Sequence, residues 1–473
     1  MTNEGGGGAE WVDGTCLSST PSPSVPAYRP STAIHALGPA FYDPVEPADF
    51  PETTLRYRDD RAAESVGLGR LSDGDWIAHF ARFRSLPDNL PKPLALRYHG
   101  HQFRHYNPDI GDGRGFLHAQ VLDGDDRLLD LGTKGSGRTP YSRDGDGRLT
   151  LLGGVREVLA TRYLEHMGVN TSRSLSLVET GEALQRGDEP SPTRSSVLVR
   201  LSHSHIRFGT FQRLYALGRP EETEALVAYC IRHFYPEASG AEEMFADVVA
   251  ASASTVASWM AAGFVHGVMN TDNMNITGES FDYGPYRFLP HLDPGFTAAY
   301  FDRHGLYAFA RQPEAMAWNL AQLAQALSSV ADEARLLRSL EGFAAHYRDA
   351  LSAHALRRLH LESVDPEVDA RTVAELFTWL EATRASWPHA WHDLKGGPGQ
   401  MRLDGSPNAE LYIGAEWERL RTQLARHTPL GEVEQGPPAT LLYDEIGELW
   451  APIRDSDDWS AFHGRLDTFS RAE

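Results

Sequence analysis

The hydrophobic pattern of the chain changes near Phe211, and this change constrains the fold more than any other feature. Before it, short apolar and β-branched runs predict strands at 116–122, 128–134 and 197–201, with a helix at about 149–167. After it, a 3.6-residue spacing predicts helices at 221–234, 241–262, 316–356 (more than one) and 372–387. The sequence therefore predicts an α+β chain in which a small β-rich part precedes a larger helical part.

Composition excludes several classes of protein. The 473 residues include 44 Lys and Arg against 65 Asp and Glu, so the net charge is −21, the wrong sign for a nucleic-acid-binding surface. Only Cys16 and Cys230 are present, which is typical of a reducing compartment. The N-terminal residues lack the basic and apolar regions of a secretory signal, and no run resembles a membrane span. We expect a cytoplasmic protein that binds neither nucleic acid nor membrane. Residues 1–35, rich in Gly, Ser, Thr and Pro, predict a disordered tail.

A glycine-rich segment, Gly111-Asp112-Gly113-Arg114-Gly115, stands directly before the first of these strands. Glycines let backbone N–H groups approach a phosphate closely, although a plain tight turn has the same pattern. Lys134 ends the second strand and Glu157 lies in the next helix. A glycine loop, a strand lysine and a helix glutamate in this order are the parts of a kinase nucleotide site.

A second motif runs from His266 to Asn273 and is followed by Asp282-Tyr283-Gly284. Aligned with the kinase catalytic loop and its D-F-G segment, it supplies both metal ligands, Asn273 and Asp282. The position of the kinase base, however, is Val268, which cannot accept a proton. Asp272 is the only nearby carboxylate that could act as the base.

Further motifs accompany these two in the same order along the chain. They read GHQF at 100–103, GDGR at 111–114, KGSGRTPYSRDGDGR at 134–148, VRE at 155–157, SHIRFGTF at 204–211, HGVMNTDN at 266–273, FDYGP at 281–285 and QPEAMAWNL at 312–320. From about Tyr42 to Leu323 the chain resembles the selenoprotein O family of kinase-fold protein adenylyltransferases.

The resemblance implies a protein-kinase-like, two-lobed pseudokinase fold. Its small β-rich N-lobe, with an N-terminal extension, would span 36–212, its larger helical C-lobe 213–395, and a divergent C-terminal helical region 396–473. It also implies that ATP is bound inverted relative to kinases, so that AMP is transferred to Ser, Thr or Tyr hydroxyls of protein substrates.

The resemblance assigns roles to individual residues. Asp272 would be the general base, Asn273 and Asp282 would bind Mg²⁺ or Mn²⁺, and Glu157 would orient Lys134. The nucleotide would be bound by Gly111, Gly113, Arg114, Lys134, Asp146, Gly147, Arg200, Arg207 and Asp282. Such a set of cations and metal would neutralise a leaving pyrophosphate, as nucleotidyl transfer requires.

Beyond Leu323 we expect the match to fade, and the chain ends in SRAE without the family's terminal Cys or selenocysteine motif. Two other functions fit the same residues: transfer of the γ-phosphoryl group by an atypical kinase, and a catalytically inactive nucleotide-binding scaffold. Val268 argues against the first, and the complete set of phosphate and metal residues argues against the second. Another donor such as UTP stays open, as do the acceptor residue, the preferred metal and the oligomeric state.

Overall fold

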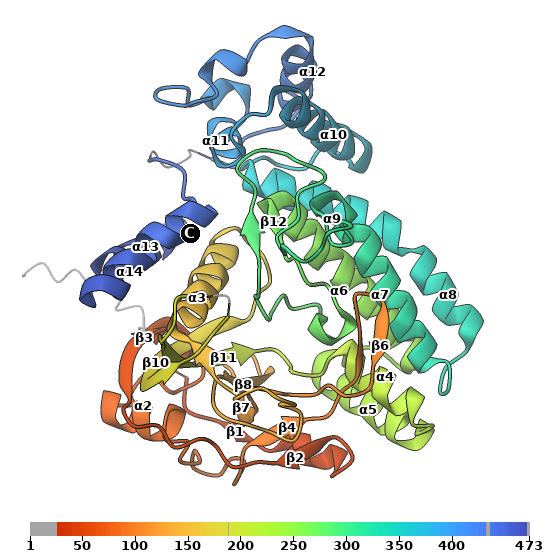
Figure 1. Cartoon of the computed structure of the whole chain (residues 1–473). Helices are drawn as coiled ribbons and strands as arrows, with labels where there is room; N and C mark the ends of the chain where they lie inside the picture. The colour runs from red at the N-terminus through yellow and green to blue at the C-terminus, as the bar shows by residue number, and fades with distance from the viewer. Residues whose placement is uncertain (1–25, 188, 432–435, 471–473) are drawn as a thin grey trace, which may run out of the picture.

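The computed structural model describes residues 26–187, 189–431 and 436–470. Within them, nine strands form one large antiparallel sheet, and most of the later residues form helices (Figure 1). The order along the sheet is β2, β4, β7, β8, β11, β10 and β3, with β1 paired to β7 and β9 paired to β11. The strands are β1 (Pro30–Ser31), β2 (Tyr42–Pro44), β3 (Thr54–Arg58), β4 (Leu94–Leu96), β7 (Leu117–Leu122), β8 (Leu128–Lys134), β9 (Leu149–Thr150), β10 (Arg173–Leu184) and β11 (Thr193–Ser202). The α+β class predicted from the sequence agrees with this arrangement.

The register between β8 and β11 brings two basic residues together. Lys134 lies opposite Leu198, and Arg200 lies opposite Gly132. Residues opposite each other or two apart on neighbouring strands point to the same face. The side chains of Lys134 and Arg200 therefore project from one face of the sheet.

Helix α3 (Leu151–His166) covers that face (Figure 1). Its N-terminus is capped by Thr150, whose hydroxyl accepts a hydrogen bond from Gly153 N at 3.0 Å. Val155, Val158 and Leu159 are fully buried and belong to the same core as the sheet residues Leu177 and Leu198. This packing fixes the rotation of α3 about its axis and buries Glu157 on the side of the helix that faces the sheet.

The remaining described residues are mainly helical. They form α1 (Asp60–Ser65), α2 (Asp73–Phe80), α4 (Phe208–Ala216), α5 (Pro220–Phe234), α6 (Ala241–Ala262), α7 (Gln312–Leu327), α8 (Glu333–Glu341), α9 (Phe343–Arg358), α10 (Pro366–Thr383), α11 (Trp387–Asp393), α12 (Gly414–Leu424), α13 (Tyr443–Ser456) and α14 (Ser460–Ser470). Small strands β12 (Phe264–Val265) and β13 (Arg287–Phe288) pair beside α6, and β5 (Gly100–Gln102) and β6 (His105–Asn107) form a hairpin.

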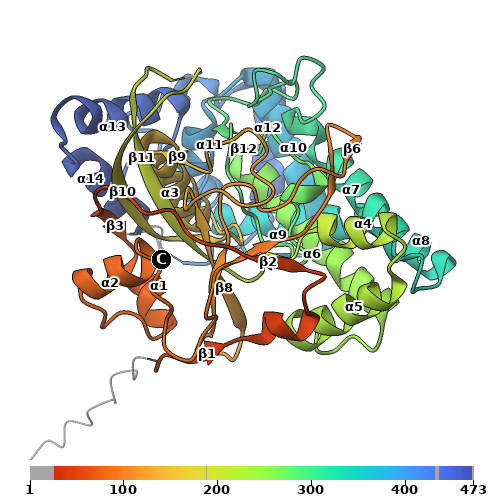
Figure 2. The same cartoon turned by 60° about the horizontal axis from the view of Figure 1, so that its bottom comes forward.

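Helix α6 is the centre of the helical part and packs against α7, α8 and α9. By length and composition it could cross a membrane, but 72% of its most apolar window is buried inside the protein. Its apolar character is thus explained by burial. Helices α13 and α14 contact α3, and Phe462 of α14 packs against Tyr57 of β3, so both helices lie beside the sheet (Figure 2).

Several elements agree with the sequence predictions: the strands at 116–122 and 128–134, and the helices near 149–167, 221–234 and 241–262. The region 316–356 does contain more than one helix, α7 to α9. The long strand β10 was not predicted. Most of the tail expected at 1–35 lies outside the described residues, but residues 26–35 differ from that expectation. Pro30–Ser31 pairs with β7 and Ile34 is buried, because this stretch covers an edge of the sheet core.

Candidate active site

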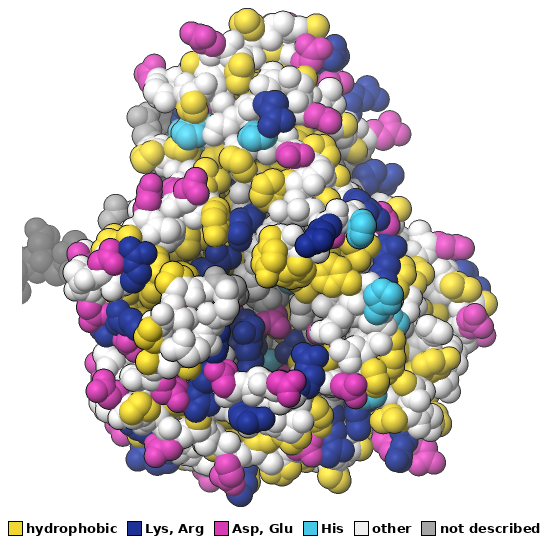
Figure 3. Space-filling model, viewed as in Figure 1, with side chains coloured by type: hydrophobic (Ala, Val, Ile, Leu, Met, Phe, Trp, Pro, Cys, Tyr) yellow, Lys and Arg dark blue, Asp and Glu magenta, His cyan; other side chains and the backbone are white. Residues whose placement is uncertain are grey.

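A cavity of about 720 Å³ lies between the sheet, the glycine-rich segment and the loops that follow α6. In the space-filling view it is the hollow near the centre, with basic and acidic side chains visible inside it (Figure 3). Among the predicted site residues it is lined by Gly111, Gly113, Arg114, Lys134, Asp146, Gly147, Arg200, Arg207, Asp272 and Asp282. The fold thus brings together residues that lie up to 171 positions apart in the chain.

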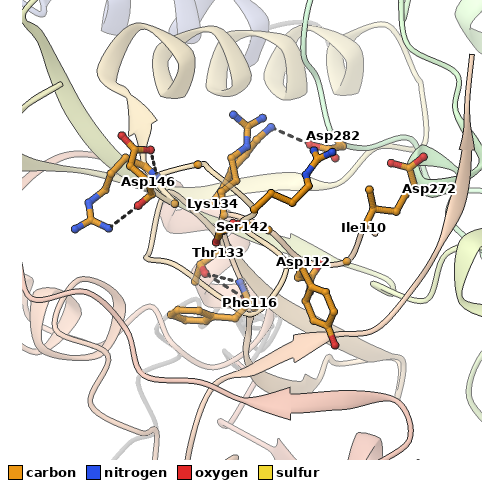
Figure 4. A pocket seen from close by; sticks show the side chains of 18 of the residues that line it. Ile110, Asp112, Phe116, Thr133, Lys134, Ser142, Asp146, Asp272 and Asp282 are labelled. Atoms are coloured by element: carbon orange, nitrogen blue, oxygen red, sulfur yellow. Dashed lines mark hydrogen bonds and ion pairs between the residues drawn. The ribbon is translucent and has the colours of Figure 1, made fainter. Parts of the chain in front are cut away.

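Lys134 is the centre of a buried ion-pair network. Its Nζ lies 2.5 Å from Glu157 Oε2 and 2.9 Å from Asp282 Oδ1. Glu157 is 1% exposed on α3, and Asp282 approaches from the loop that follows β12, as Figure 4 shows. The predicted pairing of Glu157 with Lys134 is therefore present in the structure.

Two buried arginines surround the same carboxylate. Arg200 Nη1 lies 3.6 Å from Asp282 Oδ1, and Arg207 Nη1 lies 3.5 Å from Asp282 Oδ2. Arg207 Nη1 also donates a 2.7 Å hydrogen bond to the backbone carbonyl of Asp272. The Nε and Nη1 atoms of Arg200 and the Nε of Arg207 are buried and make no hydrogen bond to any described residue. Buried donors without acceptors are costly, so these guanidinium groups are suited to an anionic ligand.

Asp282 is held ionised by these cations. Burial alone would raise the pKa of its carboxyl, but Lys134, Arg200, Arg207 and Arg114 together hold that pKa well below its usual range. Its φ of +63° lies in the left-handed region, which is uncommon for a residue other than glycine. The backbone conformation directs a permanently charged carboxylate into the cavity.

The glycine-rich segment forms one wall of the cavity. A Cβ at Gly111 would stand 2.5 Å from the ring of Tyr141, and one at Gly113 would stand 2.9 Å from the Tyr141 carbonyl oxygen. Packing against Tyr141 therefore requires glycine at both positions. Glycine at these positions also lets a phosphate approach the backbone closely. Gly147 has a φ of +72°, which favours glycine.

Asp146 lies at the opposite end of the cavity from Asp272 and Asp282 (Figure 4). Its two carboxylate oxygens accept hydrogen bonds from Arg186 at 2.8 and 3.1 Å. The cavity thus has two chemically different ends: one with buried cations around Asp282 and one with the exposed Asp146–Arg186 pair.

Asp272 has the properties expected of a base. Its Oδ1 is buried and has no hydrogen-bond partner among the described residues. Burial raises the pKa of Asp272 to about 6, against the opposing effect of Arg207. A carboxylate with that pKa is ionised at neutral pH and can accept a proton from an attacking hydroxyl.

Asn273 lies next to Asp272 in the short 3₁₀ helix η2 (Thr271–Asn273), but it does not line the cavity. Its Nδ2 donates a 3.0 Å hydrogen bond to the carbonyl of Val268, so its Oδ1 is the side-chain atom available to a ligand. The described residues contain no cluster of three or more His, Cys, Asp or Glu suited to a metal. Two oxygen donors, Asn273 Oδ1 and Asp282, fit a hard cation that takes its other ligands from phosphates and water.

Three residues that contact Arg207 were missed by the sequence reasoning, and two of them, Tyr98 and Asp112, line the cavity. Asp112 Oδ1 lies 3.5 Å from Arg207 Nη2. Asp112 Oδ2 accepts a hydrogen bond from Leu96 N at 3.0 Å. Tyr98 and Phe281 stack against the Arg207 guanidinium, with centroid distances of 4.6 and 4.8 Å. The motifs GDGR and FDYGP already contained Asp112 and Phe281, so their aspartate and aromatic positions were the signal that could have found them.

Comparison with known proteins defines first the class of the protein. A relative from Trichodesmium erythraeum, named protein nucleotidyltransferase YdiU, is 51% identical over 469 residues, covering 93% of this chain and 97% of its own. The relatives of the same name from Synechocystis and Vibrio cholerae are 45% and 36% identical, over 92% and 86% of this chain and 96% and 82% of their own. The chain is a nucleotidyltransferase.

The family follows from a second comparison. A family model described as Protein adenylyltransferase SelO matches residues 27–469, so the chain belongs to the SelO family. This confirms the family suggested by the motifs. The expectation that the match fades beyond Leu323 was wrong, because the similarity continues into α14.

Proposed function

We propose that the protein transfers AMP from ATP to a Ser, Thr or Tyr hydroxyl of another protein. The observation that carries the proposal is a cluster of buried cationic side chains at one end of the cavity whose hydrogen-bond donors are only partly satisfied. Lys134, Arg200 and Arg207 converge on Asp282, and three of the arginine nitrogens have no hydrogen-bond acceptor among the described residues. The oxygens of a polyphosphate supply the missing acceptors.

The positions of the carboxylates support an inverted nucleotide. If the β- and γ-phosphates occupy the cationic end, the α-phosphate is the group that an acceptor hydroxyl can attack. Asp272 is then the base that removes the hydroxyl proton, while Lys134, Arg200 and Arg207 stabilise the charge that develops on the departing pyrophosphate. Val268, at the position of the kinase base, takes no part in this reaction.

A divalent cation, Mg²⁺ or Mn²⁺, would be held by Asn273 and Asp282. When bound, it would neutralise phosphate charge that the side chains alone leave uncompensated. Glu157 would keep Lys134 oriented, and Gly111, Gly113, Arg114, Asp146 and Gly147 would contact the rest of the nucleotide. The order of these parts along the chain supports a kinase-like two-lobed arrangement, with the nucleotide between the sheet and the helical part.

The proposal is tested by the position of the label. The purified protein is incubated with a cell extract, Mg²⁺ or Mn²⁺, and ATP labelled at either the α- or the γ-phosphate. We expect label on proteins from the α position only, with a mass gain of one AMP group on a hydroxyl residue. Label from the γ position would make the protein a kinase, and more efficient labelling by α-labelled UTP would make it a uridylyltransferase.

Two variants test the assigned roles. Asp282→Ala should abolish transfer together with metal-dependent nucleotide binding. Asp272→Asn, in contrast, should lose at least about a hundredfold in rate while still binding ATP, because it removes only the base. Equal labelling by both variants and the wild type would contradict the site assignment.

A further inference from the structure

Aromatic and basic side chains gather beside the mouth of the cavity. We call this the rim surface and define it by Phe103, Arg104, Tyr300, Phe301 and Arg303. Tyr300 is 86% exposed and Phe301 is 47% exposed, which is unusual for large aromatic side chains. Figure 3 shows hydrophobic side chains next to the central hollow.

The hairpin formed by β5 and β6 connects the rim surface to Asp272. A Cβ added at Gly100 would lie 2.9 Å from Asp272 Oδ1, so β5 runs directly against the proposed base. His101 N donates to Thr271 Oγ1 at 2.7 Å, and Phe103 N donates to Asn270 Oδ1 at 3.0 Å. The tip of this hairpin is therefore fixed to the loop that carries the base.

The hairpin turn has an unfavourable sequence for its conformation. Gln102 pairs with His105, which leaves a two-residue turn at Phe103 and Arg104 with φ values of +49° and +63°. Such turns favour Asn-Gly, because side chains are strained at positive φ. Strain of this kind is concentrated at functional sites, and here it directs an aromatic and a basic side chain to the rim.

The loop 296–307 supplies the other half of the surface. The rings of Phe103 and Phe301 have centroids 5.7 Å apart, and those of Phe103 and Tyr307 are 5.0 Å apart. Tyr307 also donates its hydroxyl hydrogen to Asn270 Oδ1 at 2.9 Å. Hairpin and loop thus form one continuous surface that is anchored on the residues preceding Asp272.

The rim surface is locally basic on a chain whose net charge is −21. Arg104 and Arg311 share a single exposed carboxylate, Glu314, at 2.9 and 3.1 Å. Arg303 is exposed and makes no ion pair with any described residue. The neighbouring Asp302 is buried, and its carboxylate accepts hydrogen bonds from the backbone N–H groups of Leu306 and Tyr307. The charge that this surface leaves uncompensated is positive.

We propose that the rim surface is the docking site for the acceptor protein, and that it binds an extended segment with acidic and apolar residues near the modified hydroxyl. The apolar residues pack on Tyr300 and Phe301, and the acidic ones pair with Arg104 and Arg303. The hairpin then presents the hydroxyl to Asp272. This inference rests on the proposed transfer to protein hydroxyls.

Synthetic peptides test the inference. Each carries one Ser, Thr or Tyr flanked by Glu and Leu in one series and by Lys and Leu in the other, and label transfer from α-labelled ATP is measured. We expect KM about tenfold lower for the Glu series. The double variant Arg104→Glu with Arg303→Glu should reverse the preference, and Tyr300→Ala should raise KM for both series. ATP binding, measured separately, should be unchanged in these variants.

Arg371→Glu on α10 and Ile413→Ala, which removes a 73% exposed apolar side chain, serve as matched controls and should leave both series unaffected. Equal labelling of the two series, preference for the Lys series, or a preference insensitive to the rim variants would overturn the inference. If extract proteins are labelled but no peptide is, the rim surface does not bind linear segments and the inference also fails. If no protein or peptide is labelled, the proposed function itself has failed.

Discussion

Arg200 and Arg194 lie six positions apart on β11, yet their environments are opposite. Arg194 is partly exposed and makes ion pairs of 2.6 Å with both Glu179 and Asp457. Arg200 is buried, and its Nη1 lies 3.5 Å from Glu157 and 3.6 Å from Asp282. Neither its Nη1 nor its Nε makes a hydrogen bond to a described residue. One arginine therefore serves the fold, and the other is available to a ligand.

Replacing these two arginines should separate stability from binding. Arg200→Met should weaken ATP binding at least about tenfold, because a buried cation facing the phosphates is lost. Its melting temperature should change little, because Lys134 still pairs with the two carboxylates that face Arg200. Arg194→Met should show the reverse, with a lower melting temperature and unchanged ATP binding. Titration calorimetry and thermal unfolding measure both quantities, and a loss of ATP binding in both variants would argue against a specific role for Arg200.

Gly100 is the residue on which the position of Asp272 depends. A methyl group there would lie 2.9 Å from Asp272 Oδ1 and 3.0 Å from its Cβ, so the aspartate or the hairpin must shift. Gly100→Ala should reduce kcat by about a hundredfold, the effect expected when a base is misplaced by about 1 Å, while ATP binding is retained. Single-turnover kinetics test this. Gly74→Ala is the control, because its nearest atom is 3.9 Å away, and equal rates in the two variants would contradict the proposed contact.

Glu279 should make the free energy of unfolding depend on pH. Burial raises the pKa of this carboxyl to about 8, against the opposing effects of the His203 backbone N–H and of Arg173. Because the folded state keeps a proton that the unfolded state has lost, the free energy of unfolding should fall as pH rises from about 4.5 to about 8. The slope from this residue is about 1.4 kcal/mol per pH unit at most.

Denaturant unfolding at several pH values measures that slope. In the wild type, His203 N donates to the two carboxylate oxygens of Glu279 at 3.1 and 3.0 Å. The glutamine of the Glu279→Gln variant keeps an oxygen acceptor for His203 N, but this side chain cannot ionise. Its stability should therefore decline less steeply between pH 5 and pH 8, conditions that span most of this window. Identical pH profiles of variant and wild type would show that Glu279 does not carry a raised pKa.

At the scale of elements, α13 is linked to the active site through α3. Tyr443 is the first residue of α13, and two arginines lie over its ring. The guanidinium of Arg287 is 3.7 Å and that of Arg156 is 5.8 Å from the ring centroid. Arg156 also donates to the backbone carbonyls of Gly284 and Tyr286 at 3.4 Å. It precedes Glu157 on α3, so the C-terminal helices support the helix that orients Lys134.

Tyr443→Ala should therefore destabilise the protein by about 1–2 kcal/mol, the value of two partly exposed cation–π contacts. It should also reduce the rate of transfer, because α3 and the loop after Asp282 lose a common support. Chemical denaturation and a transfer assay measure the two effects. Tyr215→Ala, at a 42% exposed position on α4, is the control that should change neither. A variant as stable and as active as the wild type would exclude this link.

The elements also show where sequence reasoning succeeds. Helix α6 was predicted to its observed ends, because Gly263 supplies a left-handed C-cap and the helix is apolar over most of its length. The proposed site residues Lys134, Glu157, Asp272 and Asp282 could be singled out from the sequence because their motifs are local. The Arg207–Asp112 contact and the contact of Gly100 with Asp272 were not predicted, since both depend on how distant segments pack.

For the whole molecule, the cavity joins two parts of the chain that differ in structure. Lys134 and Arg200 come from the sheet, whereas Asp272 and Asp282 come from loops of the helical part. A ligand bound by both groups holds these parts together, and its binding energy adds to the stability of the folded chain.

Melting temperatures with different ligands test this coupling. ATP with Mg²⁺ should raise the melting temperature, with a stabilisation of about 2.7 kcal/mol when its concentration is a hundred times Kd. Tripolyphosphate without metal should also raise it, because the buried cations act on phosphate charge alone, whereas adenosine should have little effect. The Arg200→Met variant should lose most of the response to tripolyphosphate. Equal shifts with adenosine and with tripolyphosphate would contradict this coupling. They would mean that contacts to the nucleoside contribute as much to binding as the contacts between the buried cations and the phosphates.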